Sequence, residues 1–448
     1  MTLPSGFRAC LVACLGLLLA ATASAQMDQV FEEQGVSPRD TAMGNAFSGV
    51  ANDYTAAYYN PAGLFQVRKT QISVGYKYIQ PVLYLRMPTA YGMNFTDYPN
   101  TRLLTLGLTS DLNFPRFLNP KITSRVSFGL AIAISNYLKS FTTYIAPEVP
   151  YFARYSDRQV ALLSIYAGLS IKITDWLAVG ASMVPATVTK LSAAVLTLTD
   201  LQHMKWTSRQ AIISRSVTIA KPVVGVMFKP PVWWFRDHLS IGLVWRDEVQ
   251  GDDGTGKSRA FTQLVFADGT SYKNIPYADN PVYGLTGFSP TQVTLGFGVY
   301  PIHGMTIAVD ETWKRWSRWR NFMHLHPSPL WNDTFQTRIG IEHVWTFNYM
   351  WVYSVAVRGG WYYEPSPVPD RPSSWNLLDN DKHVVSAGMG MEIGHVLGFF
   401  TAPVTFDLAY QQHILQQRTD ANQGDDLFPR MRYGGYLYAL SASFTFKF

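Results

Sequence analysis

Apolar and polar side chains alternate along the last strand-length segment of the chain. From Tyr436 to Phe448 every second residue is apolar or aromatic, and the residues between them after Leu437 are small or polar. Because successive side chains of a strand point to opposite faces, this pattern predicts a strand with one apolar and one polar face. Its length suits a strand that crosses a bilayer at a tilt, and aromatic residues at both ends are typical of an outer-membrane barrel strand.

The same alternation recurs along most of the chain. In residues 351–361, for example, Val357 and Trp361 lie on one predicted face and Arg358 lies on the other. About fourteen such segments follow one another, and an even number of strands is typical of single-chain bacterial barrels. Charged side chains on the polar faces should point into the barrel, since a charge that faces lipid is costly. The predicted strands cover residues 70–80, 101–112, 124–137, 160–174, 176–189, 210–228, 238–249, 291–300, 305–315, 335–345, 351–363, 383–393, 403–414 and 436–448.

The links between the predicted strands are alternately short and long. Those near residues 174–175, 301–304 and 346–349 are short. This alternation is expected when turns lie in the periplasm and loops lie outside, and an even strand count then places both termini in the periplasm. The link at 112–123 departs from the rule, because it lies on the short side but is long and contains proline. The long links cover residues 190–209, 250–290, 316–334, 364–382 and 415–435.

One long link has a different pattern. In residues 190–205, Leu191, Val195, Leu198 and Leu201 recur near helical spacing, which predicts a helix in an outer loop. Such a helix could pack on neighbouring loops, or its side chains could contact an apolar ligand. Leu191, Val195 and Leu198 are therefore candidate ligand contacts.

Composition favours a membrane barrel over a soluble protein. The chain has 448 residues, of which 15% are charged and 14% are aromatic, whereas soluble proteins contain roughly 25% charged residues. Mean hydropathy is -0.01, and no apolar run long enough for a spanning helix follows the N-terminal region. Abundant aromatic residues without a spanning helix fit a barrel with a polar lumen. The alternative is a secreted β-rich protein.

Residues 1–25 are predicted to be a secretory signal peptide. Arg8 precedes an apolar stretch, and a small-residue cleavage site follows at 23–25. Residues 11–14 resemble a lipoprotein processing box, which leaves lipidation as an alternative.

Cysteine and charge exclude several kinds of chemistry. Both cysteines, Cys10 and Cys14, lie in the predicted signal peptide, so the mature protein would have no disulfide, thiolate nucleophile or cysteine metal site. The formal net charge is +6 and includes no basic block, so no nucleic acid partner is expected.

The segment that follows, residues 26–67, is rich in Gly, Ala and Asn and has no strand period. Its blocks from Gly35 to Gly49 and from Ala56 to Leu64 resemble the N-terminal hatch of the FadL-type outer-membrane transporters. The resemblance spans the whole mature chain in matching order. Further similar segments are Trp316-Ser317, Arg338-Ile339-Gly340, Arg358-Gly359-Gly360, Glu364 to Asp370 and the C-terminal strand.

This resemblance implies an all-β fold, a transmembrane antiparallel β-barrel of about 14 strands over residues 68–448 with the hatch, residues 26–67, in its lumen. Members carry long-chain fatty acids or aromatic and other hydrophobic compounds. Hatch movement releases the ligand, in known members through a gap in the wall beside an inward-kinked third strand. No cofactor or energy source is implied. The hatch motif comprises Asn60, Pro61, Ala62, Gly44 and Gly63.

The physics of the hatch is compatible with this function. Small residues can pack inside a barrel and still move, because Gly and Ala leave little bulk. Pro61 fixes its own φ and restricts Asn60, so the Asn60-Pro61-Ala62 triplet predicts a defined turn.

No catalytic or metal site is expected. Barrel lipases use Ser, His and a third polar residue, but no spacing singles out such a set here. His324 and His326 lie two residues apart without nearby acidic partners, and residues 251–256 lack the full ligand series of a calcium loop.

Tryptophans alternate with cations near the end of one predicted strand. Trp313, Trp316 and Trp319 are interleaved with lysine and arginine from Lys314 to Arg320. A nucleic-acid patch is one interpretation. The favoured one is a strand end at the outer interface, with Trp in the girdle and cations toward anionic lipid head groups or lipopolysaccharide.

Arg338 and Arg358 lie on the polar faces of two neighbouring predicted strands. A cation inside a plugged barrel needs a partner, which Glu342 or Asp407 could supply. Alternatively, at least one arginine meets a substrate carboxylate.

The predicted function is passive transport of a hydrophobic small molecule across the outer membrane, and the alternative is a general porin or a structural outer-membrane protein. We expect a monomer whose C-terminal strand, ending in Phe448, is recognised by the barrel-assembly machinery.

Overall fold

The structure is a computed structural model. It describes residues 28–67, 70–86, 94–95, 100–111, 126–135, 163–188, 195–201, 204–209, 217–232, 235–250, 260–265, 271–277, 288–319, 326, 329–349, 351–369, 379–394, 403–419 and 432–448. The predicted signal peptide, His324 and residues 251–256 therefore lie outside the described residues. No described helix is long and apolar enough to cross a membrane.

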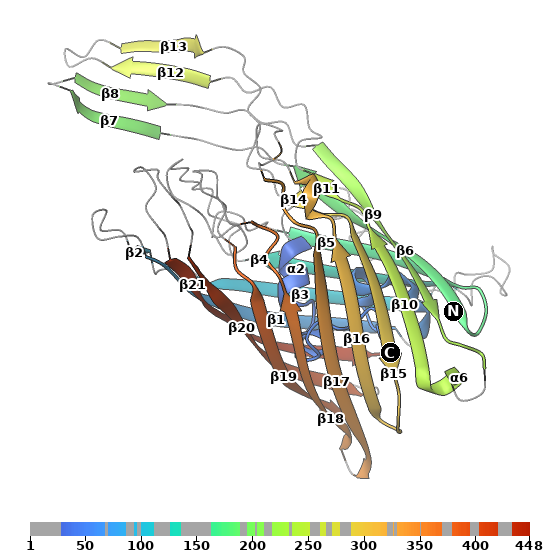
Figure 1. Ribbon diagram of the computed structural model, residues 1–448. Coiled ribbons are helices and arrows are strands. Elements are labelled where there is room, and N and C mark those ends of the chain that lie inside the picture. Colours follow the sequence, from blue (N-terminus) through green and yellow to red (C-terminus); the bar gives the residue numbers. More distant parts are fainter. Residues whose placement is uncertain are drawn as a thin grey trace.

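Fourteen long strands close into an antiparallel barrel (Figure 1), which confirms the predicted fold class. The ring closes where the first strand pairs with both the last and the second. The barrel strands are β1 (Gln71–Arg86), β3 (Thr101–Asp111), β4 (Val126–Ser135), β5 (Leu163–Lys172), β6 (Leu177–Val188), β9 (Val217–Phe228), β10 (Leu239–Arg246), β15 (Gln292–Val299), β16 (Met305–Lys314), β17 (Thr334–Tyr349), β18 (Val352–Glu364), β19 (Lys382–Ile393), β20 (Val404–Thr419) and β21 (Arg432–Lys447).

Each barrel strand separates a polar inner face from an apolar outer face. On β16, Asp310 and Lys314 are buried in the lumen, whereas on the neighbouring β15 Leu295 is 40% exposed on the outer wall. This is the arrangement that the alternation predicted, because lipid accepts apolar side chains and excludes charges.

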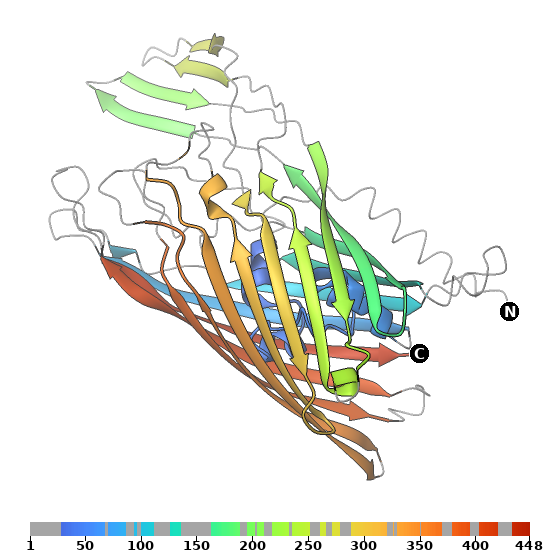
Figure 2. The same cartoon turned by 45° about the vertical axis from the view of Figure 1, so that its right-hand side comes forward.

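Short hairpins extend from the long links. β7 (Val195–Leu201) pairs with β8 (Met204–Arg209), and β12 (Ala260–Val265) pairs with β13 (Ser271–Tyr277). Figures 1 and 2 show both hairpins beyond one end of the barrel. The remaining short elements are β2 (Asn94–Phe95), β11 (Val249–Gln250), β14 (Phe288–Ser289), α6 (Phe235–His238) and η5 (Trp316–Arg318).

The prediction of a helix over residues 190–205 is wrong, because residues 195–201 form strand β7. Its leucines alternate with Thr197 and Thr199, so the segment has a period of two as well as an approximate helical spacing. Threonine is branched at Cβ and favours a strand, and pairing with β8 satisfies the backbone.

The short turns lie at the end of the barrel opposite these hairpins. β5 and β6 are joined through residues 173–176, and β15 and β16 through 300–304. The third short link lies later than predicted, since β17 runs to Tyr349 and β18 begins at Val352. Cross-strand pairing of Thr346 with Ser354 keeps residues 346–349 in the ladder region.

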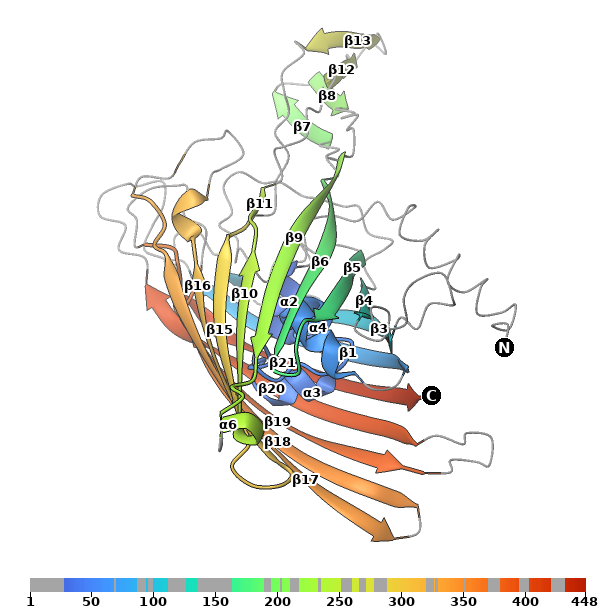
Figure 3. The ribbon, with the colours of Figure 1, turned by 90° about the vertical axis from the view of Figure 1, so that its right-hand side faces the viewer.

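Residues 28–67, the plug segment, lie within the ring of strands (Figure 3). They fold into α2 (Asp28–Gln34), α3 (Pro38–Ala42), α4 (Ala56–Tyr59) and η2 (Pro61–Gln66). A buried aromatic cluster joins Phe31 and Tyr58 of the plug to Tyr166 of β5, with ring centroids 5.0–5.5 Å apart. The core of the protein is thus the contact between plug and wall.

Candidate functional site

The Asn60-Pro61-Ala62 triplet forms a capped turn deep in the plug segment. The Asn60 side chain accepts a hydrogen bond from the Ala62 backbone N–H at 3.1 Å and so caps η2, which Pro61 begins. Its amide also donates to the carbonyl oxygens of Ser48 at 2.9 Å and Val226 at 3.2 Å. One side chain therefore fixes the turn, a second plug loop and strand β9 relative to one another.

Inward-facing glycines of the wall make room for this turn. A Cβ at Gly180 would collide with Pro61 and Ala62, and a Cβ at Gly225 would collide with Asn60. A Cβ at Gly129 would likewise collide with Leu64, and one at Gly242 with the Ser48 carbonyl oxygen, whereas at Gly168 the nearest plug atom would be 3.3 Å away. We call the set on β4, β5, β6, β9 and β10 the glycine seat: Gly129, Gly168, Gly180, Gly225 and Gly242.

Charged side chains hold the opposite side of the plug. Lys314 of β16 pairs with Glu32 of α2 and, at 2.7 Å, with Glu364 of β18. Lys382 of β19 lies 3.1 Å from Glu33 of α2 and 3.0 Å from the same Glu364. Two plug carboxylates thus complete a buried network of alternating charge. We call this side the charged wall, comprising Lys314, Arg338, Glu342, Arg358, Glu364 and Lys382.

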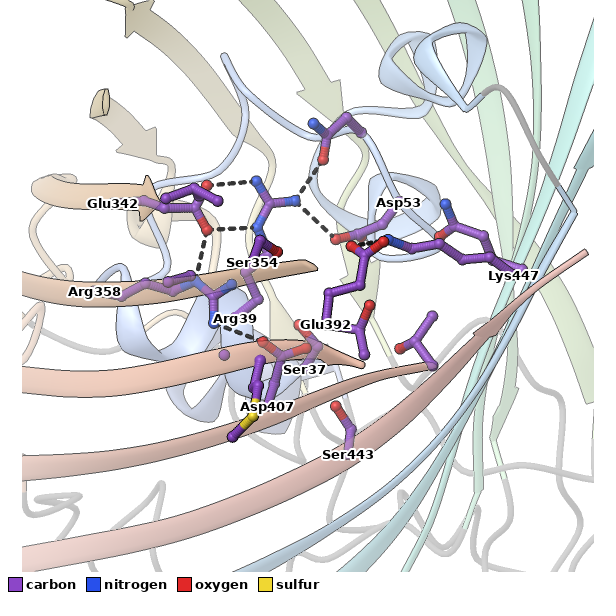
Figure 4. Close-up of a pocket in the computed structure, with 18 of the residues that line it drawn as sticks. Ser37, Arg39, Asp53, Glu342, Ser354, Arg358, Glu392, Asp407, Ser443 and Lys447 are labelled. Atoms are coloured by element: carbon purple, nitrogen blue, oxygen red, sulfur yellow. Dashed lines mark hydrogen bonds and ion pairs between the residues drawn. The ribbon is translucent and has the colours of Figure 1, made fainter. Parts of the chain in front are cut away.

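A second ion network lies at the short-turn end of the plug (Figure 4). Arg39 of α3 binds both carboxylate oxygens of Glu342, at 2.8 and 3.0 Å. Arg358 donates to Glu342 at 2.6 Å and to Asp407 at 2.7 Å. Glu342 therefore bridges a plug arginine and a wall arginine.

These groups border a cavity of about 270 Å³ at the short-turn end of the barrel, here named the polar vestibule. Lys447 and Glu392, 2.8 Å apart, stand at its outer edge. Charges of both signs line the vestibule, so it favours water and disfavours an apolar solute. Its charged residues are Arg39, Asp53, Glu342, Arg358, Glu392, Asp407 and Lys447.

Two further wall residues bind the plug backbone. Lys77 of β1 donates to the carbonyl oxygens of Gln34 and Gly35, the latter at 2.8 Å. Asp310 of β16 accepts from the backbone N–H groups of Phe47 at 2.9 Å and Ser48 at 2.8 Å. Backbone polar groups of a buried loop must find partners, and here the wall supplies them.

Burial and charge act on the ionisable groups of the plug. Burial alone would raise the pKa of Glu32, but Lys314 and Arg338 lower that pKa to about 2. Burial raises the pKa of Asp40 to about 6, against the opposing effects of Lys77 and of hydrogen bonds from Ser37. Burial opposes the charge of Arg39, but Glu342 and Asp53 raise the pKa of Arg39 above its ordinary value.

The structure places each candidate residue. Arg358 is engaged by both carboxylates that the sequence offered as partners, and Arg338 contacts the carbonyl oxygen of Glu32 at 3.3 Å and lies over the Tyr362 ring. Val195 and Leu198 lie on β7, while Leu191 lies outside the described residues.

The two motif glycines occupy tight positions of the plug. Gly44 has φ of +62°, and a Cβ there would lie 2.7 Å from the backbone nitrogen of Trp361. Gly63 approaches the Ala51 carbonyl so closely that no side chain fits. Both positions require glycine for conformation or space.

Sequence reasoning missed several residues that hold the plug. Lys77, Lys314 and Lys382 each occupy a polar-face position between outward residues of a strand, which is the signal that could have found them. The glycine seat has a similar signal, since its members occupy inward positions of strands whose outward neighbours are larger. What the pattern lacks is any indication of which plug residue each one meets.

The interpretation of the Trp313–Arg320 region needs correction. Lys314 faces the lumen and not lipid head groups. Trp316 and Trp331 are buried together, and Trp319 stacks on Trp331 at 4.2 Å between ring centroids. Trp316 and Trp319 therefore pack on Trp331, which precedes β17, while Arg315 remains exposed.

A closed barrel, a lumen filled by an N-terminal segment and an apolar outer wall define a plugged outer-membrane transport barrel. The comparisons agree with this class. The chain belongs to the outer membrane protein transport protein family (OMPP1/FadL/TodX), whose model matches residues 16–446. It is therefore a member of a transport family and not of an enzyme family.

Particular relatives resemble the chain along nearly its whole length. Alkane uptake protein A of Marinobacter nauticus is 25% identical over 98% of this chain and 95% of its own. The solved structure of a Pseudomonas aeruginosa FadL homologue has a TM-score of 0.55 at 15% identity, covering 95% of this chain and 98% of its own. The Ralstonia pickettii toluene transporter TbuX has a TM-score of 0.51 at 12% identity, covering 93% and 100%.

Proposed function

We propose that this protein carries hydrophobic compounds, of the class of alkanes, long-chain fatty acids or aromatic hydrocarbons, passively across the outer membrane. The observation that carries the proposal is the plug segment, which fills the lumen and is held there by wall residues on both sides. A general porin works through an open aqueous lumen, whereas a hydrophobic solute needs a path lined by apolar groups. The similarity to an alkane uptake protein supports the substrate class.

The proposed transport cycle requires movement of the plug. Its described contacts with the wall are ion pairs, hydrogen bonds and apolar contacts, all of which can rearrange without breaking a covalent bond. Spin labels at Asn52→Cys of the plug and Thr346→Cys of β17, both exposed positions, would measure this movement. Their distance distribution should broaden when a hydrophobic ligand is added, and an identical distribution with and without ligand would indicate a static plug.

Release sideways into the membrane is the second part of the proposal. The polar vestibule opposes direct passage of an apolar solute to the periplasm, because its charges would lose hydration. The third barrel strand, β4, pairs with both neighbours along its described length. The ladder is interrupted one strand later, between β5 and β6. These two strands pair through Ala167–Lys172 and Ala178–Met183. Beyond that point, residues 163–166 of β5 pair with β4, and residues 184–188 of β6 pair with β9.

A cross-strand staple tests this exit. Ser164→Cys and Ala186→Cys occupy positions that would be cross-strand partners if the β5–β6 register continued past Ala167 and Met183. Oxidation to a disulfide should reduce uptake toward background, and reduction should restore it. Full uptake by the cross-linked protein would place the exit elsewhere.

The arginines are proposed to serve substrates that carry a carboxylate. In the plugged state Arg358 is paired with both Glu342 and Asp407, so a fatty acid carboxylate would compete with these two groups. Arg358→Ala should then reduce uptake of palmitate far more than uptake of hexadecane. Equal losses would assign the arginine a structural role. Arg338 and the β7–β8 hairpin residues Val195 and Leu198, with Leu191 before them, are further proposed contacts.

Uptake by whole cells tests the function itself. Cells that express the chain should accumulate radiolabelled hexadecane, palmitate or toluene faster than cells with an empty vector. The same cells should show no increase in permeability to a small hydrophilic solute. Increased hydrophilic permeability without hydrocarbon uptake would favour the porin alternative.

The lengths of the links between strands indicate how the barrel is oriented in the membrane. We propose that the short turns and both termini face the periplasm, with the long links outside. Phe448 follows β21 on the short-turn side, where its backbone N–H donates to the carbonyl oxygen of Thr70 at 2.9 Å, and the exposed ring is available to the assembly machinery. Protease added to intact cells should cleave the long links and spare the termini.

A further inference from the structure

Four polar side chains form one row on the outer wall of the barrel. Glu311 of β16, Thr337 of β17, Tyr363 of β18 and His383 of β19 are successive cross-strand partners. Their chain neighbours, such as Lys382 beside His383, are buried in the lumen. The alternation of a strand therefore directs these four side chains toward lipid.

The same row is apolar or aromatic on the neighbouring strands. Leu295 and Leu243, on β15 and β10, precede Glu311 in the ladder, and both are well exposed on the outer wall. On the other side His383 is followed by Ile414 and Tyr436. Within this row, the polar side chains are thus confined to β16–β19.

The row lies near the long-link end of the apolar belt. Trp313 and Phe335, which belong to the aromatic girdle, lie one outward position nearer to that end than the row. Ile339 and Trp361 lie one outward position farther from it. Polar groups on the lipid face are least costly near the interface, and a carboxyl group there still needs hydrogen-bond donors.

The carboxylate of Glu311 has few hydrogen-bond donors around it. Thr337 Oγ1 donates to Glu311 Oε2 at 2.7 Å, and within the described part of the chain the other Glu311 oxygen has no hydrogen-bond partner. The His383 ring packs on Tyr363, with centroids 4.8 Å apart, and Tyr363 donates to Asp381. Beyond Trp313, the exposed Arg315 adds a cation just outside the girdle.

We propose that this face binds a lipid A-type glycolipid of the outer leaflet. Amide N–H and 3-hydroxyl groups at the head of its acyl chains are donors at the depth of Glu311 and His383, and its phosphates suit Arg315. The ester region of a phospholipid offers only acceptors at that depth, so it cannot satisfy the carboxyl group. The proposal rests on the proposed orientation, in which the long links face outward.

Lipid retention by the purified full chain tests the site. The probes are hexa-acylated lipid A and phosphatidylethanolamine, each counted by native mass spectrometry after mixing with the barrel in detergent. Glu311→Leu combined with Thr337→Val should reduce lipid A retention by about tenfold, as expected for the loss of one or two hydrogen bonds to a charged group. Ile414→Ala, in the same row on β20, is the matched control and should change neither lipid.

The outcomes separate the possible occupants. Unchanged lipid A retention, or an equal loss of both lipids, would overturn the proposal. A change from dimeric to monomeric mass in the double variant would also overturn it, because the row would then be a contact between copies of the chain. Lipid binding in detergent does not require transport, so failure of the proposed transport function would leave this result standing, and uptake of hexadecane should be unchanged in the double variant.

Discussion

Inward glycines lie against the plug on both of its sides, as at Gly225 and Gly360, but the buried ion pairs described above lie on one side. On the charged wall, Glu32 and Glu33 join a buried network with Lys314, Lys382 and Glu364. On the glycine seat, the plug backbone lies against inward glycines and is held by hydrogen bonds such as that from Asn60 to Val226.

This difference indicates a division of roles. Buried charges must be paired in one arrangement, so the charged wall specifies where the plug docks. On the glycine seat the plug is held by close backbone packing and by hydrogen bonds, including one from Arg246 to the carbonyl oxygen of Tyr58. A small shift can rearrange such contacts at less cost than it can separate a buried ion pair. We therefore expect the plug to be anchored at β16–β19 and to move first at the glycine seat, beside the proposed exit between β5 and β6.

The largest expected effect comes from the charged wall. Lys314→Met would leave Glu32 and Glu364 buried without their shared cation and should lower the free energy of unfolding by roughly 3–5 kcal/mol. Unfolding in urea measures the loss. Lys172→Met, which removes an exposed pair with Asp175, should cost less than about 1 kcal/mol. Similar losses for the two variants would contradict the anchoring role, and adding Glu32→Gln to Lys314→Met should recover part of the stability.

The glycine seat should respond to bulk. Gly225→Leu would place a side chain where Asn60 lies and should cost about 1–3 kcal/mol or expel the plug. Protease accessibility of the plug in purified barrels reports expulsion. Gly359→Leu is the matched control, because the nearest atom to a Cβ there is 3.7 Å away. A plug that stays protected in Gly225→Leu would show that the seat adapts easily.

Substitutions in the Asn60-Pro61-Ala62 turn, which contacts the glycine seat, should affect transport more than assembly of the barrel. Asn60→Ala removes the cap of η2 and two hydrogen bonds, and should destabilise docking by about 1–2 kcal/mol. Hydrocarbon uptake should fall while the amount of barrel in the membrane stays constant, and Pro61→Ala should act in the same direction. Uptake equal to that of the parent at equal expression would remove the triplet from the mechanism.

The smallest effect is a dependence on pH within the plug. The pKa of Asp40 is raised from 3.8 to about 6, so the docked plug holds this proton more tightly than an unfolded chain. The resulting stabilisation is complete below the unfolded pKa and is lost as pH rises through 6. Between pH 5 and 7 the free energy of unfolding should decrease by about 1 kcal/mol relative to Asp40→Asn. Parallel pH profiles of the two proteins would contradict the assignment.

Some contacts of the site could be predicted from the strand pattern, and others could not. Arg358 and its candidate partners Glu342 and Asp407 were predictable, because each occupies an inward position and a buried cation needs an anion. The bridge from Glu342 to Arg39 was not, since it joins residues 303 positions apart that only the docked plug brings together. The inward positions of the glycine seat follow from the alternation, but the plug residues that these glycines meet do not, for the same reason.

The sequence by itself determined the fourteen strands and the two faces of the wall. Both follow from a period of two, and in a membrane that period is enforced locally because each outward residue meets lipid and each inward residue does not. Tertiary structure decided the rest. Residues 195–201 satisfy both a helical and a strand pattern, and pairing with β8 selected the strand. Which lysine meets which plug carboxylate, and where β5 parts from β6, depend on how the ring closes around the plug, which no local pattern encodes.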